Sequence, residues 1–208
     1  MQINIDKKTG VLLAIIALLG ATVISFAVNR DGDHMGNNGM NNNGMGGHMS
    51  NHNTNNSRYT GADIMFLQMM IPHHQQAVDI SNLAMKTSKD SELLALAKKI
   101  AADQTSEIAM MKAWLKDAGA STDMGHSMEG MGGMLNDAEL SALNAESGTK
   151  FDLLWLKGMT GHHDGAIHMT TMIRDASNPD IKAFGEKVVA DQSAQIEQMK
   201  AMIARLSA

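Results

Sequence analysis

The 208-residue chain contains no cysteine, few aromatic residues and no excess of positive charge. Without cysteine it can form no disulfide, no thiolate metal site, no haem attachment through Cys-x-x-Cys-His and no cysteine nucleophile. An aromatic content of 3% is low for a large β-rich core. A net charge of −5 offers nucleic acid no basic surface. The length suits one domain, or one domain with appendages.

Methionine is the residue in excess, with 20 copies. Because methionine is a flexible core filler, packing explains any single copy, and only the distribution is informative. Residues 31–58 are rich in Gly, Asn, Met and His and nearly lack aliphatic residues, which predicts a disordered linker. This linker nevertheless carries seven soft or borderline donors: Met35, Met40, Met45, Met49, His34, His48 and His52. Exposed methionine favours metal capture here, with compositional drift as the alternative.

Residues 1–30 are predicted to be a membrane anchor or a signal peptide. Lys7 and Lys8 precede an apolar run over residues 11–28, which is at the lower length limit of a membrane-spanning helix. The lysines would stay in the cytoplasm and place the rest of the chain outside, in the periplasm or on the outer face. Cleavage near Ser25-Phe26-Ala27 is the alternative and would give a secreted protein. We favour the uncleaved anchor.

From residue 60 onward, apolar residues recur with helical spacing. The pattern predicts long helices over residues 60–87, 91–118 and 149–176 and from 178 to the C-terminus, with a short one over 136–145. Thr60 is expected to cap the first helix, and Asp63 and Asp152 are interpreted as capping partners three residues into their helices. Asn178 and Pro179 suit the first positions of the last helix.

The second half of this region repeats the first. At an offset of 89, Thr60 matches Thr149, and Met70-x-x-His73-His74 matches Met159-x-x-His162-His163. At an offset of 88, residues 102–104 match 190–192. The repeat defines two helical hairpins, 60–118 and 149–207, joined by a Met- and Gly-rich connection over 119–148. Since one hairpin cannot cover its own apolar stripe, residues 59–208 are predicted to be an all-α, ferritin-like up-down four-helix bundle.

Six side chains are candidate metal ligands: Met70, His73, His74, Met159, His162 and His163. If the first and third helices run parallel on a diagonal, these groups meet in one layer. Counting from the turns places Asp103 and Asp191 at the same height, where they could orient the imidazoles. Thioether with imidazole favours Cu(I) or Ag(I), whereas imidazole alone also accepts Cu(II) or Zn(II). The alternative is a hydrogen-bonded histidine network without metal.

Other chemistry is less well supported. A di-iron carboxylate bundle requires Glu-x-x-His motifs, which are absent, and Glu107 of the first repeat is matched by Gln195 in the second. No nucleophile or acid–base pair indicates an enzyme. His168 lies off the core-facing arc and is assigned to the surface. Four further methionines, Met110, Met111, Met199 and Met202, are assigned mostly to packing.

The Met-x-x-His-His motif at 70–74, followed by Gln-x-x-Glu-Ile-x-x-Met at 104–111, resembles the bacterial family named domain of unknown function 305. The resemblance extends over residues 60–207. It implies a ferritin-like bundle and, for some members, extracytoplasmic copper binding in copper tolerance at the Met/His layer. Gln195 departs from the family pattern, which expects Glu.

Together these features favour a copper-binding protein that buffers Cu(I) or delivers it. A metal-accepting protein or a second copy of the chain is a candidate partner, besides the membrane that residues 11–28 would span. A helical interaction module is the first alternative, and a metal-dependent bundle oxidase the second.

Overall fold

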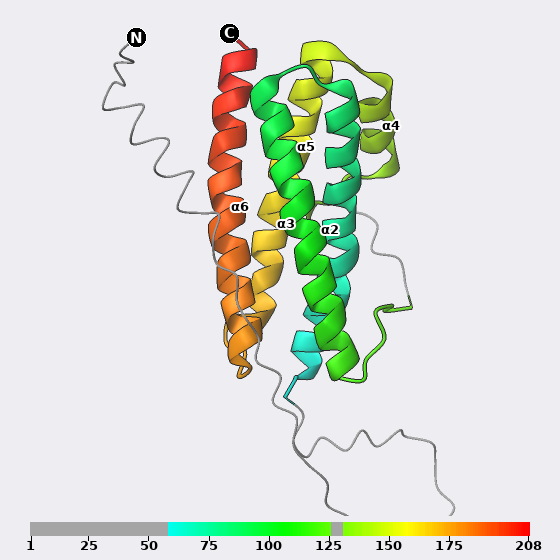
Figure 1. The fold of residues 1–208 in the computed structure, drawn as a ribbon, viewed down its shortest axis with the longest axis vertical. Coiled ribbons are helices and arrows are strands. Elements are labelled where there is room, and N and C mark those ends of the chain that lie inside the picture. The colour runs from blue at the N-terminus through cyan, green and yellow to red at the C-terminus, as the bar shows by residue number, and fades with distance from the viewer. Residues whose placement is uncertain (1–57, 126–130) are drawn as a thin grey trace, which may run out of the picture. The chain divides into compact units, whose positions relative to one another are not determined.

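The computed structural model describes residues 58–125 and 131–208, and every regular element within these ranges is helical (Figure 1). In chain order the elements are α2 (Gly61–Thr87), α3 (Ser91–Asp117), η1 (Met131–Gly133), α4 (Asp137–Ala145), α5 (Gly148–Met169), η2 (Thr170–Ile173) and α6 (Pro179–Leu206). The all-α bundle expected from the sequence is therefore confirmed. The predicted anchor, residues 1–30, and all of the predicted linker, residues 31–58, except Arg58 lie outside the described residues. Among the helices described, none is both long and apolar enough to cross a membrane.

Capping side chains explain where most helices begin. The Thr60 hydroxyl accepts from the Asp63 amide at 3.1 Å, and the Asp63 carboxylate accepts from the Thr60 amide at 2.8 Å, so the predicted capping box of α2 is confirmed. Asp90 caps α3, and Asn178 caps α6 with Pro179 at its first position. These caps satisfy amide groups that have no partner inside a helix.

The start of α5 departs from the repeat. Its N-cap is Ser147, which makes no side-chain capping bond, and Gly148 follows with a φ of 58°. Asp152 is therefore not a capping residue as predicted: it is buried at 5% exposure, and its Oδ1 atom has no hydrogen-bond partner. The matched Thr149 lies inside the helix because the chain enters α5 through a glycine turn, unlike the entry into α2 through Thr60.

The two hairpins, α2–α3 and α5–α6, pack against each other in antiparallel fashion. Trp155 near the start of α5 donates from Nε1 to the Ile80 carbonyl near the end of α2, at 3.0 Å. Arg205 near the end of α6 likewise pairs with Asp90 at the start of α3, at 2.7 Å. The expectation of parallel first and third helices on a diagonal was wrong, since α2 and α5 are antiparallel neighbours (Figure 1). The connection after α3 returns along the bundle through α4, as in ferritin-like folds with one crossover.

Two apolar clusters make up the core and follow each other along the bundle axis. One contains Ala77 of α2 together with Trp155 and Met159 of α5. The other contains Met70 of α2 and Ala166 of α5. The histidines at 73–74 and 162–163 fall between these positions in both helices. A polar layer is thus enclosed by apolar side chains at both ends.

Candidate metal centre

Four imidazoles form the polar layer between the two core clusters, and each of them is fully buried, with 0% exposure. His73 of α2 and His162 of α5 are in ring contact, with their centroids 3.7 Å apart and the planes tilted by 36°. The neighbouring rings lie further away: the centroids of His73 and His74 are 6.3 Å apart, and those of His162 and His163 are 6.2 Å apart. The structure therefore brings together all four histidines that the sequence singled out. We call them the histidine layer.

Every imidazole of the histidine layer uses its Nε2 atom for a hydrogen bond to an oxygen. His74 bonds to Glu107 Oε2 at 2.9 Å, and His163 bonds to Gln195 Oε1 at 2.6 Å. His162 bonds to the His73 carbonyl at 3.0 Å, whereas His73 bonds to the Gly132 carbonyl at 2.7 Å. Because carbonyl and carboxylate oxygens only accept, Nε2 donates in each case, and a neutral ring then carries its lone pair on Nδ1.

The four Nδ1 atoms are the chemically unsatisfied groups of the layer. All four are buried and have no hydrogen-bond partner. A buried polar atom left unpaired costs on the order of 1–3 kcal/mol, so four of them in one layer call for an explanation. A neutral imidazole whose opposite nitrogen is held by an acceptor is the form in which histidine binds metal.

Burial keeps three of these rings neutral, namely those of His73, His162 and His163. It lowers the pKa of His73 to about 3 and that of His163 to about 4, and it lowers the pKa of His162 well below its ordinary value. The neighbouring imidazoles add to this effect on His73 and His162. These three rings are unprotonated at neutral pH, and no proton competes with a metal for their nitrogen atoms.

Glu107 is a buried carboxylate that joins the histidine layer to the surface. One of its oxygens bonds to His74, and the other accepts from Lys187 Nζ of α6 at 2.8 Å. Burial opposes the ionisation of Glu107, but the bonds from His74 and Lys187 outweigh it and lower the pKa. Lys187 also pairs with Asp191 at 2.6 Å, and half of its side chain is exposed. Burial opposes the charge of Lys187, yet these two carboxylates raise its pKa above the ordinary value.

Asp103 and Asp191 do not orient the imidazoles, contrary to the sequence-based expectation. Asp103 pairs with Lys99 at 2.7 Å and Asp191 with Lys187, and both carboxylates are about a third exposed. His74 and His163 instead bond to Glu107 and Gln195, one helical turn further along. The prediction counted residues back from the turn of each hairpin and assumed the same rise per residue in its two helices. The extended Ser88 cap of α2 and the 3-10 turn η2 after α5 shift this register.

The η1 segment covers His73 through a contact that the sequence did not reveal. Gly132 supplies the carbonyl for His73, and Gly165 of α5 lies directly beneath it. A Cβ atom at Gly165 would overlap the Gly132 carbonyl, and one at Gly133 would overlap the Gly161 carbonyl. Only glycine allows the two backbones to come this close. The glycines at 132–133 and 161–165 were the available signal, but their spacing does not identify their partners.

Met70 and Met159 are both buried at 0% exposure, but they belong to different core clusters. Antiparallel packing of α2 and α5 puts one of them on each side of the histidine layer. The exposed position of His168 agrees with its assignment to the surface, and Met111 and Met199 are buried in the core, in accordance with their assignment to packing.

The described residues contain no group of three or more His, Asp or Glu side chains arranged to hold a metal ion. The ring contact between His73 and His162, together with the unpartnered Nδ1 atoms, nevertheless offers nitrogen donors within one buried layer. The donor set fits a metal of low coordination number better than one that needs several oxygen ligands.

A small polar cavity of about 10 Å³ adjoins the layer between α3 and α6. It is lined by Val188 and by three pairs of residues that are equivalent in the repeat: Asp103 and Asp191, Gln104 and Gln192, and Glu107 and Gln195. The side-chain amides of Gln104 and Gln192 are buried at 3% exposure and have no hydrogen-bond partner. We call this region the α3–α6 seam.

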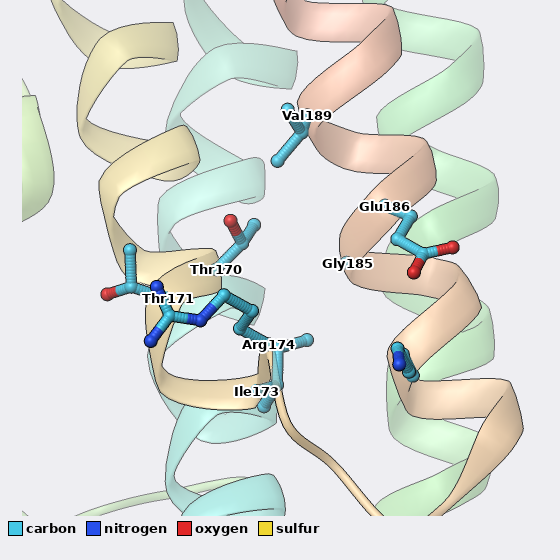
Figure 2. A pocket seen from close by; sticks show the side chains of 8 residues that line it. Thr170, Thr171, Ile173, Arg174, Gly185, Glu186 and Val189 are labelled. Carbon is cyan, nitrogen blue, oxygen red and sulfur yellow. The ribbon is translucent and has the colours of Figure 1, made fainter.

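A larger pocket of about 290 Å³ lies away from the histidine layer, between η2 and α6 (Figure 2). Figure 2 shows Thr170, Thr171 and Arg174 on one side of it and Gly185, Glu186 and Val189 on the other. Both threonine hydroxyls donate to carbonyl groups in the last turn of the preceding helix, α5. The Arg174 side chain is 75% exposed. Since none of these groups is a buried donor awaiting a ligand, the pocket is a weaker candidate than the histidine layer.

Comparison with known proteins identifies relatives of the described bundle. The sequence model of the family described as "Domain of unknown function (DUF305)" matches residues 63–203. A DUF305 protein from Streptomyces coelicolor, described as secreted, has a similar structure with a TM-score of 0.67 and 31% identity, covering 71% of this chain and 93% of that one. A DUF305 fragment from Deinococcus radiodurans has a TM-score of 0.66 and 28% identity, with coverage of 70% and 97%.

A third similar structure is CopM in its Cu(I)-bound form, with a TM-score of 0.59 and 29% identity, covering 71% of this chain and 97% of CopM. CopM structures with Cu(II) and with silver are also similar to this chain. No curated protein matches the chain in sequence.

Proposed function

The chain belongs to the DUF305 family, and from that premise we propose that it binds copper, as Cu(I), in the buried histidine layer. In this proposal it is an extracytoplasmic protein that buffers the metal, supports copper tolerance or passes the metal to an acceptor. Ag(I) is the expected mimic and Cu(II) the second oxidation state. The observation that carries the proposal is the set of four buried Nδ1 atoms without partners.

Different residues of the chain would have different roles in such a site. The Nε2 hydrogen bonds to Glu107, Gln195 and the two backbone carbonyls hold the rings in one tautomer and orientation. The apolar clusters on both sides exclude water from the layer. Met70 and Met159, one in each cluster, are proposed as thioether ligands that reach the layer from opposite sides. Bound Cu(I) would supply no catalysis here, since it is the cargo of the protein.

Similarity to CopM supports the choice of metal. CopM structures with Cu(I), Cu(II) and silver share the fold of this chain at 28–30% identity. Imidazole and thioether donors prefer these soft or borderline ions. We further propose that residues 11–28 anchor the protein in the membrane, that the Met- and His-rich linker collects metal weakly, and that the bundle is not an enzyme.

A competitive titration tests the copper site. The full chain is titrated with Cu(I) against a chromophoric chelator without oxygen, beside a variant with His73, His74, His162 and His163 all replaced by Gln. We expect the tight site to disappear in this variant and to persist in His168→Gln, which changes an exposed histidine on the same helix. Equal tight binding by the four-histidine variant, while its far-UV circular dichroism is unchanged, would refute the proposal.

The main alternative is a hydrogen-bonded histidine layer in an interaction module. Its support is that each Nε2 already donates to an oxygen of the chain itself. In that case the four-histidine variant changes thermal stability or partner binding and leaves the copper content of the protein unchanged. The same titration, accompanied by a melting curve, therefore distinguishes the two functions.

A further inference from the structure

The histidine layer has two flanks, and they are built differently. On the α2–α5 flank, η1 lies over His73, and glycine backbones pack so closely that a single Cβ atom would not fit. On the other flank, the α3–α6 seam contains a cavity, half-exposed Lys187 and two partly exposed carboxylates. A small ion coming from solvent would meet backbone on the first flank and flexible polar side chains on the second.

The seam presents its polar groups in three successive levels. Asp103 and Asp191 lie at the mouth, about a third exposed, and each is paired with a lysine of its own helix. Gln104 and Gln192 follow, buried and without partners, so their rotation breaks no hydrogen bond. Glu107 and Gln195 come last and touch the histidines directly. The cavity is about the size of a single water molecule, so passage of an ion depends on this freedom to rotate.

Lys187 lies across this path as a positive charge. Its ammonium group bonds to Asp191 at the mouth and to Glu107 at the layer. The equivalent residue of the other repeat, Lys99, also pairs with the aspartate four residues on, but that is the only ion pair it makes among the described residues. The difference has a clear cause, because the second repeat has uncharged Gln195 where the first has Glu107.

We propose that metal cations reach the histidine layer through the α3–α6 seam, and that the Lys187 ammonium is a resident cation which the incoming metal displaces. This inference rests on the proposed copper site and adds its route and its control. Lys187 neutralises Glu107 while the layer is empty, and it repels a second cation at short range. It swings outward when the metal arrives, which its half-exposed side chain permits.

The test measures how fast Cu(I) enters the layer. The full chain is mixed anaerobically with the Cu(I)–bicinchoninate complex, and the loss of its colour is followed by stopped flow. The phase missing from the four-histidine variant is assigned to the layer. Lys187→Met is expected to speed this phase by about tenfold, since it removes a like charge a few ångströms from the path. Lys99→Met, the matched change in the other repeat, should alter it by less than about twofold.

A second pair of changes tests the route itself. Gln104→Leu with Gln192→Leu fills the seam with apolar groups and leaves the histidines and their partners in place. We expect the layer phase to slow by about tenfold while the equilibrium affinity for Cu(I) stays within about threefold, because transport changes and the site does not. Since the replaced amides have no partners, the fold should tolerate both changes. Lys187→Arg keeps the charge and should load as slowly as the wild type.

The outcomes separate the route from the site. If the wild type and the four-histidine variant load identically, both the copper site and its route are refuted. If the layer phase exists but Lys187→Met behaves like Lys99→Met, or if the double glutamine variant loads at the wild-type rate, the inference is overturned and the copper site stands.

Discussion

The hydrogen bond made by each Nε2 atom decides what the four buried imidazoles can do. A ring that donates from Nε2 to a carbonyl has its lone pair on Nδ1 as long as it stays neutral, and burial keeps it neutral. The sequence could reveal the histidines, because two Met-x-x-His-His motifs recur at one offset. It could not reveal their partners, since Asp103 and Glu107 differ by one helical turn and only the register of the folded hairpin selects between them.

The lowered pKa values of the layer predict acid sensitivity of the metal-free protein. A histidine whose pKa falls from 6.5 in the unfolded chain to about 3 or 4 in the folded one binds a proton on unfolding. The free energy of unfolding should therefore fall as the pH drops below 6.5 and continue to fall until the folded pKa is reached. Each such histidine contributes up to about 1.4 kcal/mol per pH unit in this window.

Urea unfolding between pH 7 and pH 5 measures this slope. His73→Gln should make it shallower, because one of the shifted groups is gone. The control is His168→Gln, which replaces an exposed histidine of α5 and should leave the slope intact. A slope that is the same in His73→Gln as in the wild type would contradict the assignment of His73 as a neutral buried ring.

At the scale of elements, helices were predictable and the segment that covers the site was not. The caps at Thr60 and Asn178 mark helix starts by local chemistry, and both occur where expected. In contrast, η1 has no apolar period. Its position depends on glycines, because Gly165 and Gly133 have no Cβ atom and so let the η1 backbone lie against α5. An absent Cβ atom leaves no pattern that indicates which surface it will contact.

The glycine contact between η1 and α5 gives a matched pair of mutations. In Gly165→Ala the new methyl group overlaps the Gly132 carbonyl, so η1 must move away from His73. We expect a loss of about 1–3 kcal/mol in the free energy of unfolding, typical of overpacking. Gly161→Ala, one turn earlier on α5, has open space around the new methyl group and should be stabilising by up to about 1 kcal/mol. Guanidinium unfolding of both variants measures the difference, and equal stabilities would show that η1 does not pack as described.

At the scale of the whole molecule, the fold is a duplicated hairpin, and the second copy packs antiparallel to the first. The repeat predicts two hairpins, but it does not predict their relative direction. A helix of 27 residues is roughly 40 Å long, and the connection between the hairpins is long enough to finish at either end of the bundle. The return through α4 makes α2 and α5 antiparallel, which brings His73 against His162 and separates Met70 from Met159.

The approximate symmetry of the two copies predicts what a second carboxylate would do. Gln195→Glu places a negative charge against His163, where Glu107 lies against His74 in the other copy. Lys99 then lies beside the new carboxylate as Lys187 lies beside Glu107, and it should turn from Asp103 alone to bridge both acids. If the new carboxylate is paired in this way, the double variant should lose more free energy of unfolding than the two single variants together. The difference should be about 0.5–3 kcal/mol.

A double-mutant cycle of Gln195→Glu with Lys99→Met, read by urea unfolding at pH 7, measures that coupling. The same cycle with Lys187→Met in place of Lys99→Met is the control, because Lys187 is already bound to Glu107 and Asp191. A coupling present only with Lys99 means that the lysine of each hairpin pairs with the carboxylate that holds a histidine in the other hairpin. Equal coupling in both cycles, or none in either, means that the lysine bridge is peculiar to Lys187 and that symmetry does not extend from the backbone to the charges around the site.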